Sequence, residues 1–244
     1  MEHVPPRVLI VPGLNGHPGL LLRAAPTLFP CWRPVVFNHH VDLAEGGVDG
    51  LAERALAVLG DDPAPVFVCG ESFGGTVALT VAHHAPERVR GLILFSAFGW
   101  HPSLLARRGV AALAVWSFLG GRVARPVYQA GRLLSLPTQL GLQRLPPDLV
   151  RAYIDRPRAH VAAYRIKAEL SLTFDARPWL PTLACPTFVL VGSWDPVVPA
   201  SAGRELARSI PNAVLHQLPG GHLVHLVRAP LVAGLIARWA RGLH

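Results

Sequence analysis

The fold is decided by the segment Pro65-Val66-Phe67-Val68-Cys69-Gly70-Glu71-Ser72-Phe73-Gly74-Gly75, where an apolar run passes directly into a helical pattern. A G-x-S-x-G pentapeptide spans Gly70 to Gly74 at that junction. A serine at such a strand-to-helix turn sits in a sharp bend, and glycines on either side leave room for the neighbouring chain. The segment therefore predicts a nucleophilic serine, Ser72, at the end of a buried strand.

Short apolar runs alternate with helical patterns along the chain, and glycine, proline or polar turns separate them. Six runs predict buried strands, at residues 7–11, 34–37, 66–69, 91–96, 187–191 and 214–218. Helical patterns cover residues 20–28, 48–59, 75–84, 202–209 and 230–243. This alternation predicts an α/β core with a mostly parallel sheet of about six strands between two layers of helices. Reactive groups in such a sheet gather at the carboxyl ends of its strands.

One long segment, residues 99–178, breaks this alternation. It contains helical patterns at 104–119, 123–134, 149–153 and 159–170 and no convincing strand. The prolines near its end, at Arg177-Pro178 and Leu180-Pro181, mark where the chain rejoins the sheet. We therefore expect a helical cap (lid) subdomain at 99–178, inserted into a core made of residues 1–98 and 179–244.

The net charge of +8 has a definite place in the chain of 244 residues. Residues 100–178 hold twelve Arg and Lys against four Asp and Glu, while the rest of the chain has eleven of each sign. All the net charge therefore belongs to the predicted cap, which indicates a surface that could meet an anionic partner. The segment contains no recognised nucleic-acid-binding motif, so nucleic acid is not the expected partner.

Other sequence features exclude several classes of protein. No run reaches the ~18 apolar residues of a membrane span, and the first residues lack the pattern of a signal peptide, so we expect no integral membrane segment and a cytoplasmic location. Three cysteines, Cys31, Cys69 and Cys185, show neither C-x-x-C pairing nor ligand spacing with histidine. We expect no disulfide framework, no metal site and no cofactor.

A serine hydroxyl is a weak nucleophile, so Ser72 needs a base to take its proton and a carboxylate to orient that base. Asp195 follows the fifth predicted strand and His222 follows the sixth, in the order serine, acid, histidine. An aspartate before proline also commonly caps a turn, so both roles remain open for Asp195. His225 and His216 are the competing bases, but the first is expected at a helix start and the second within a strand.

Three motifs together resemble the α/β-hydrolase superfamily: Gly-Glu-Ser-Phe-Gly-Gly (70–75), Gly-Ser-Trp-Asp-Pro-Val-Val-Pro (192–199) and Pro-Gly-Gly-His (219–222). The resemblance implies a Ser72, His222 and Asp195 triad and a cap inserted where residues 99–178 fall. It also implies an oxyanion hole made by the backbone N–H of Phe73 and of Leu14. The loop that carries Leu14 departs from the family, because Pro12 stands where histidine is usual.

The resemblance implies a serine carboxylic ester hydrolase that forms an acyl-enzyme with small to medium acyl esters. One alternative is an esterase for methyl esters carried on an acyl carrier protein, as in biotin synthesis, with the basic cap docking the acidic carrier. Carbon–carbon bond hydrolases and perhydrolases use the same triad, and a non-catalytic ligand-binding protein of this fold is a further alternative. Aromatic side chains near the insertion and the acid are the candidates for lining the substrate site: Phe98, Trp100, Trp116 and Trp194.

Overall fold

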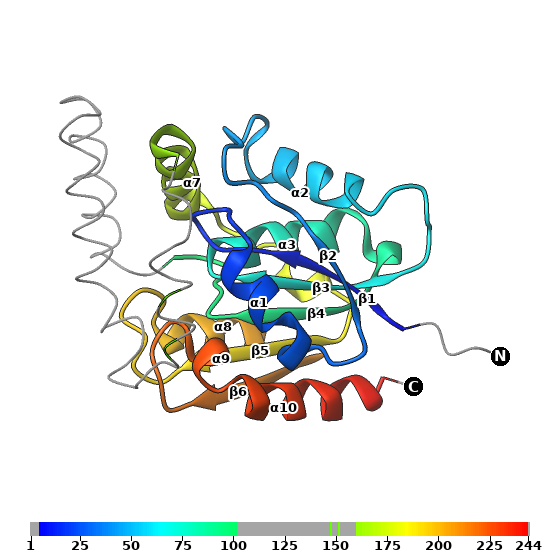
Figure 1. The fold of residues 1–244 in the computed structure, drawn as a ribbon. Helices are drawn as coiled ribbons and strands as arrows, with labels where there is room; N and C mark the ends of the chain where they lie inside the picture. Colours follow the sequence, from blue (N-terminus) through cyan, green and yellow to red (C-terminus); the bar gives the residue numbers. More distant parts are fainter. Residues whose placement is uncertain (1–4, 102–146, 148–150, 152–159, 244) are drawn as a thin grey trace.

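The computed structural model describes residues 5–101, 147, 151 and 160–243. Within these residues, six parallel strands form one sheet in the order β2-β1-β3-β4-β5-β6 (Figure 1). The strands are β1 (Arg7–Val11), β2 (Arg33–Val36), β3 (Val66–Glu71), β4 (Val89–Phe95), β5 (Thr187–Gly192) and β6 (Ala213–Leu218). The predicted α/β class and parallel sheet are confirmed.

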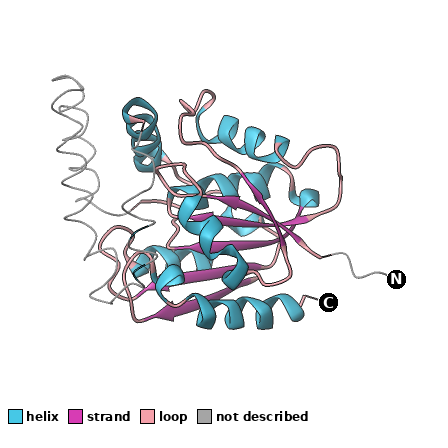
Figure 2. Ribbon diagram, in the orientation of Figure 1, coloured by secondary structure: helices cyan, strands magenta, loops and turns pink. Residues whose placement is uncertain are grey.

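Helices cover both faces of this sheet (Figure 1 and Figure 2). One face carries α1 (Gly19–Leu28), α9 (Val224–Val227) and α10 (Ala229–Arg241), whose apolar side chains share a core with the strands. The other face carries α2 (Gly47–Ala57), α3 (Phe73–His84) and α8 (Ala200–Ser209). Burial on both faces explains why each central strand is a continuous apolar run and does not alternate with polar residues.

Helix α3 begins at Phe73, two residues earlier than the sequence pattern predicts. The turn between β3 and α3 therefore consists of Ser72 alone. Glycine makes this close connection possible, because a Cβ atom at Gly74 would collide with the carbonyl oxygens of Val11 and Pro12. The first turn of α3 thus packs directly on the end of β1.

The two ends of the predicted insertion lie side by side at the base of the segment. Trp100 and Asp175 form an isolated antiparallel bridge, and the N–H of Ala176 donates to the carbonyl of Gly99 at 2.7 Å. The guanidinium carbon of Arg177 lies 4.7 Å from the ring centroid of Trp100. Residues 99–100 and 175–177 are therefore neighbours in the folded chain.

Helix α7 (Val161–Thr173) is the part of this segment that the structure describes in detail. It packs beside α3, and a Cβ atom at Gly47, the first residue of α2, would lie 3.8 Å from Leu170. The expected helices at 104–119, 123–134 and 149–153 lie outside the described residues, apart from Arg151. Short 3-10 turns at η1 (Pro86–Arg88) and η2 (Leu180–Thr182) complete the described elements. None of the described helices has the length and apolar content that crossing a bilayer requires.

Candidate active site

Ser72 has a backbone conformation that non-glycine residues rarely adopt. Its φ is 54° and its ψ is −121°, and the turn is held by two backbone hydrogen bonds. The N–H of Ser72 donates to the carbonyl of Phe95 at 2.9 Å, and the N–H of Gly75 donates to the carbonyl of Ser72 at 2.9 Å. Such stored strain, fixed by neighbouring structure, is what a nucleophile elbow requires.

Asp195 and His222 are joined by a short hydrogen bond in a buried setting. Nδ1 of His222 lies 2.7 Å from Oδ2 of Asp195. The other carboxylate oxygen, Oδ1, accepts the N–H groups of Val197 and Val198 at 2.8 and 2.9 Å. One oxygen of Asp195 therefore caps a turn, and the other is bonded to the histidine.

Charge lowers the pKa of Asp195 despite its burial. Burial alone would raise this pKa, but the charge of His222, its hydrogen bond and the two backbone donors lower it overall. For His222 the balance runs in the opposite direction. Burial would lower the pKa of the ring, yet the Asp195 carboxylate, its hydrogen bond and then the charge of Glu71 raise it above 6.5. The pair is thus suited to hold a positive imidazolium when one forms.

The loop that carries His222 is fixed against two neighbouring strands. The hydroxyl of Ser96 donates to the carbonyl of His222 at 3.0 Å. Ser96 directly follows β4 and also has a positive φ, of 46°. On the other side, a Cβ atom at Gly192 would collide with the carbonyls of Gly220 and Gly221, so the acid loop and the histidine loop are closely packed.

These contacts bring the three predicted residues to one edge of the sheet. The N–H of Ser72 donates to Phe95, the last residue of β4, and the carbonyl of His222 accepts from Ser96, the next residue. Two consecutive residues therefore hold both loops. Asp195 follows β5, the next strand in the sheet. All three positions therefore lie beyond the carboxyl ends of β3, β5 and β6, at one edge of the parallel sheet.

The loop that carries Leu14 lies directly against Ser72. A Cβ atom at Gly13 would be 3.5 Å from the Cβ of Ser72 and 3.4 Å from the carbonyl oxygen of Glu71. The N–H of Gly16 donates to the carbonyl of Gly13 at 2.8 Å, which closes a turn across Leu14. Phe73 is buried as the first residue of α3. The two expected oxyanion donors thus belong to segments that flank Ser72.

The four aromatic candidates for the substrate site have different surroundings. Phe98 is buried with Val198, and its ring meets His101 edge-on at 4.6 Å, which is core packing. Trp100 lies under the guanidinium of Arg177. Trp194 is 59% exposed beside the acid, and Trp116 lies outside the described residues. Contact of these side chains with substrate stays a prediction.

His225, which the sequence offered as a competing base, is a buried group near the site. Its ring stacks on Phe95 with centroids 4.7 Å apart, and its Nε2 lies 4.0 Å from Oε1 of Glu71. Neither ring nitrogen has a hydrogen-bond partner among the described residues. Burial, with the nearby charge of His222, lowers the pKa of His225 to about 3, so the ring is neutral.

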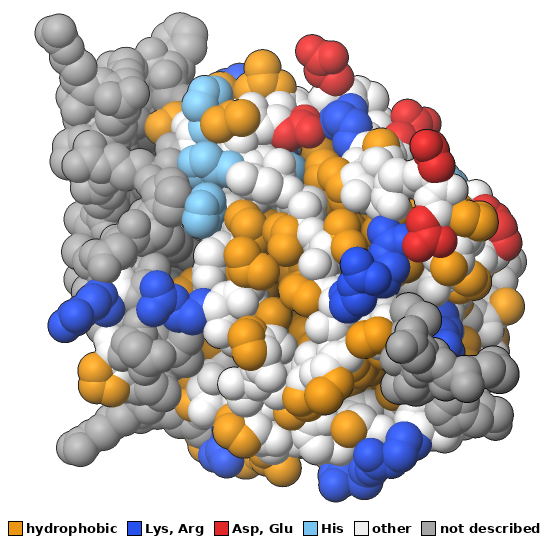
Figure 3. Space-filling view, turned by 45° about the vertical axis from the view of Figure 1, so that its right-hand side comes forward, with side chains coloured by type: hydrophobic (Ala, Val, Ile, Leu, Met, Phe, Trp, Pro, Cys, Tyr) orange, Lys and Arg blue, Asp and Glu red, His pale blue; other side chains and the backbone are white. Residues whose placement is uncertain are grey.

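Two further buried polar residues lie outside the predicted site: His39 contacts the loop that carries Leu14, and Lys167 is bonded to His39. The sequence places His39 beside another histidine on a loop and Lys167 within a helical pattern, so neither position signals a role by itself. No cluster of three or more metal-ligating side chains occurs in the described parts of the chain. The described face in Figure 3 carries side chains of both charges, which agrees with the even balance outside residues 100–178.

Comparison with known proteins adds two curated relatives. The chain is 31% identical over 185 residues to the magnesium-chelatase 30 kDa subunit of Rhodobacter capsulatus, which covers 73% of this chain and 64% of that protein. The chain therefore spans slightly less than two thirds of that relative. It is 29% identical over 230 residues to the pimeloyl-[acyl-carrier protein] methyl ester esterase of Chromobacterium violaceum, which covers 88% of this chain and 85% of that protein.

Likeness in three dimensions extends over almost the whole chain. The enol-lactonase from Burkholderia xenovorans LB400 matches with a TM-score of 0.82 at 19% identity, over 97% of this chain and 92% of that chain. At this identity the likeness shows the fold alone. The family model for the alpha/beta hydrolase fold matches residues 53–229, which contain the elbow, the acid and the histidine. The chain belongs to the α/β-hydrolase fold family.

Proposed function

We propose that the protein is a serine hydrolase that cleaves carboxylic esters, with Ser72, His222 and Asp195 as its catalytic triad. The observation that carries this proposal is the 2.7 Å hydrogen bond between His222 and Asp195, at the sheet edge where Ser72 occupies its strained turn. A buried carboxylate bonded to Nδ1 leaves Nε2 of the neutral imidazole as the proton acceptor. Nε2 is therefore the atom that activates the serine hydroxyl.

The reaction follows from these roles in two halves. His222 takes the proton of Ser72 as its oxygen attacks the ester carbonyl, and the backbone N–H groups of Phe73 and Leu14 stabilise the oxyanion. His222 then gives the proton to the leaving alcohol, which leaves an acyl-enzyme on Ser72. Water, activated by the same imidazole, attacks this acyl group and releases the carboxylic acid. Asp195 keeps its charge throughout and stabilises the imidazolium that forms in each half.

The test compares Ser72→Ala with a variant of an exposed serine outside the proposed triad. Hydrolysis of p-nitrophenyl acetate, butyrate and octanoate is measured on purified protein, with Ser201→Ala on the exposed start of α8 as the control. Loss of the nucleophile lowers kcat by about 10⁶-fold, to the level that binding and the oxyanion hole alone support, while the control keeps the wild-type rate. A fluorophosphonate probe labels the wild type and the control but not Ser72→Ala. An unchanged rate in Ser72→Ala refutes the proposal.

Residues 99–178 form, in this proposal, a cap over the site. The side-by-side ends of the segment at Trp100 and Asp175 support an insertion that leaves and rejoins the core at one point. Its twelve cations and four acids make it the basic part of the protein. The chain-length optimum in the ester series above measures how deep an acyl group enters beneath it.

A second candidate function is hydrolysis of an ester carried on an acidic acyl carrier protein. Two observations favour it: the net charge of the protein lies in residues 100–178, and one relative is named as a methyl ester esterase of such a carrier. Charge attraction between a basic cap and an acidic carrier weakens as salt screens it. A steep fall in kcat/KM with salt for the carrier-bound ester, with none for a free ester, supports this candidate. Equal salt dependence for both substrates counts against it.

A further inference from the structure

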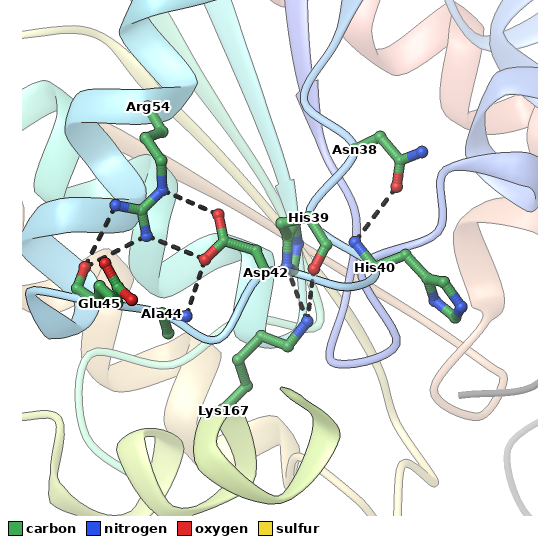
Figure 4. Close-up of polar contacts among 8 residues, drawn as sticks. All are labelled: Asn38, His39, His40, Asp42, Ala44, Glu45, Arg54 and Lys167. Carbon is green, nitrogen blue, oxygen red and sulfur yellow. Dashed lines mark hydrogen bonds and ion pairs between the residues drawn. The ribbon is translucent and has the colours of Figure 1, made fainter. Parts of the chain in front are cut away.

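The side chain of His39 contacts the loop beside Ser72. The buried amine of Lys167 is bonded in turn to His39 (Figure 4). Nε2 of His39 lies 3.0 Å from the carbonyl oxygen of Pro12. Nζ of Lys167 donates to the carbonyl of His39 at 2.6 Å and lies 3.3 Å from Nδ1 of the same ring. An ammonium group can only donate, so Nδ1 is the acceptor and Nε2 carries the proton that Pro12 accepts. A continuous chain of hydrogen bonds thus runs from α7 to Pro12.

We infer that His39 and Lys167 are positioning residues, which hold residues 12–16 in place beside Ser72 and connect this loop to helix α7. The inference rests on the proposed function, because residues 12–16 carry the expected oxyanion donor Leu14. Neither side chain is placed in contact with the reacting atoms. Their effect on catalysis acts through the position of the loop.

His39 holds the loop at both of its ends. Its side chain bonds to Pro12, and its backbone N–H donates to the carbonyl of Gly16 at 3.1 Å. Gly16 has a φ of 73°, and a Cβ atom there would lie 2.6 Å from the backbone carbonyl of His39, so only glycine allows this close approach. Nδ1 of the next residue, His40, lies 2.8 Å from the side-chain oxygen of Asn15. Successive residues of the loop therefore rest on the segment that follows β2.

The ring of His39 also lies near the second expected donor. It stacks on Phe37 with centroids 5.3 Å apart, and its centroid lies 6.2 Å from that of Phe73. Phe73 supplies the other expected oxyanion N–H. One imidazole thus packs between the loop of residues 12–16 and the start of α3, where both donors must keep a fixed spacing to bind one oxygen.

A buried amine at position 167 is costly unless it does something that an apolar side chain cannot. Burial lowers the pKa of Lys167 to about 8, although the charge of Asp42 acts in the opposite direction. Asp42 itself is turned towards Arg54, which donates to it from Nε and NH2 at 2.8 and 3.0 Å (Figure 4). Lys167 therefore bonds to neutral acceptors on His39, not to a carboxylate. The contacts of Lys167 therefore orient His39 and do not form an ion pair with Asp42.

Protonation states agree with this assignment. Burial first, and then the charge of Lys167, lower the pKa of His39 to about 3. The ring is therefore neutral and keeps one acceptor nitrogen for Lys167 and one donor nitrogen for Pro12. A protonated ring would lose the acceptor and repel the ammonium group.

The test uses two variants, each of which removes different hydrogen bonds between α7 and Pro12. Lys167→Met keeps the length of the side chain without its charge, and His39→Phe keeps a ring stacked on Phe37 without its nitrogens. Arg165→Met, a partly exposed cation on the same helix, is the control. Amide hydrogen exchange reports on residues 13–16, and kcat and KM are measured with p-nitrophenyl acetate. Thermal unfolding of each variant shows whether the fold is retained.

We expect exchange at residues 13–16 to rise by about tenfold in both variants, since the loop opens locally more often. Displacement of an oxyanion donor lowers kcat by about 10²-fold with KM nearly unchanged, because donor position matters most in the transition state. Both side chains belong to one chain of hydrogen bonds. The kcat of the double variant should therefore be little lower than the kcat of the more impaired single variant. Arg165→Met matches the wild type in every measurement.

Unchanged exchange at residues 13–16 in His39→Phe overturns the inference, whatever happens to activity. Faster exchange with unchanged kcat overturns the positioning role. If Lys167→Met does not fold, His39→Phe decides alone, because it leaves the buried amine bonded to the backbone carbonyl. A wild-type protein that hydrolyses no ester and takes no fluorophosphonate refutes the proposed function and the catalytic part of this inference, while hydrogen exchange still decides whether the pair holds the loop.

Discussion

The Asp195 carboxylate uses its two oxygens for different partners, since Oδ2 meets Nδ1 of His222 at 2.7 Å and Oδ1 accepts two backbone N–H groups. The backbone bonds prevent rotation of the carboxylate and so fix the direction of Oδ2. They also stabilise the charged form, which agrees with the lowered pKa of Asp195. A fixed, charged acceptor for Nδ1–H selects one tautomer of His222.

Asp195→Asn should therefore reduce kcat for p-nitrophenyl acetate by about 10⁴-fold, because the amide can donate to Nδ1 and favour the wrong tautomer. The control is Asp61→Asn, an exposed aspartate in the turn before β3. Circular dichroism and thermal unfolding confirm that the variant is folded. A decrease below tenfold would show that Asp195 only caps its turn.

The raised pKa of His222 predicts the acid limb of the pH–rate profile. The base acts as neutral imidazole, so kcat/KM falls when pH drops through the pKa of His222, and a raised pKa puts this inflection above 6.5. Asp195→Asn removes the main charge that attracts the proton to His222. In the residual activity of this variant, the inflection should therefore move to lower pH. Glu71→Gln removes a weaker contribution and moves it by less.

Glu87→Gln, on an exposed turn, serves as the control for this profile and leaves the inflection in place. The order of the inflections, with wild type highest, then Glu71→Gln, then Asp195→Asn, is the measured result. A wild-type inflection below 6.5 contradicts the raised pKa of His222, and an inflection unmoved by both substitutions contradicts the assignment of His222 as the base.

His225 predicts a loss of stability in acid. Its pKa is about 3 in the folded protein and close to 6.5 in the unfolded chain, so below 6.5 the unfolded state binds the extra proton. The stability due to the neutral ring is complete above 6.5 and is lost as pH falls towards 3. The free energy of unfolding then falls by at most about 1.4 kcal/mol per pH unit for this residue.

Urea unfolding of wild type and His225→Phe at several pH values tests this prediction. The phenyl ring keeps the stack on Phe95 and cannot be protonated. The variant should therefore lose less stability between neutral pH and about pH 4.5. His216→Phe, at a position where the ring is half-buried in β6, is the matched control and should change this slope much less. Parallel curves for wild type and His225→Phe would rule out the neutral buried ring.

Most of the fold was predictable because buried parallel strands have a simple sequence signature. The expected strand 7–11 coincides with β1 (Arg7–Val11), and the other expected strands differ from the observed ones by two residues or fewer at each end. The turn between β3 and α3 was harder to predict from the sequence. The pattern places the first helical residue after the elbow at 75, but α3 begins at Phe73, because the glycines there allow contacts that a pattern of apolar residues does not encode.

The site residues were predicted from sequence motifs. Motifs do not predict contacts between residues that lie far apart in the sequence. Ser72, Asp195 and His222 follow predicted strands, so topology alone brings them to one edge. Lys167 and His39 are 128 positions apart, and only the folded chain brings them together. His39 was assigned no function from the sequence, because a pair of adjacent histidines fits either a surface or a packed position.

Two glycine substitutions test whether the elbow depends on the close contact of α3 with β1. A Cβ atom at Gly74 would collide with the carbonyls of Val11 and Pro12, so Gly74→Ala must displace the loop of residues 12–16 or the start of α3. We expect it to destabilise the protein by about 1–3 kcal/mol and to reduce kcat as well.

Gly234→Ala in α10 is the matched control, because the nearest atom outside its own helical backbone is a flexible arginine nitrogen 4.0 Å away. In a helix interior alanine is favoured over glycine, so this variant should gain about 0.5–1 kcal/mol with unchanged kcat. Urea unfolding and ester hydrolysis measure both effects, and equal stability of the two variants would mean that the elbow tolerates a wider spacing than the structure has.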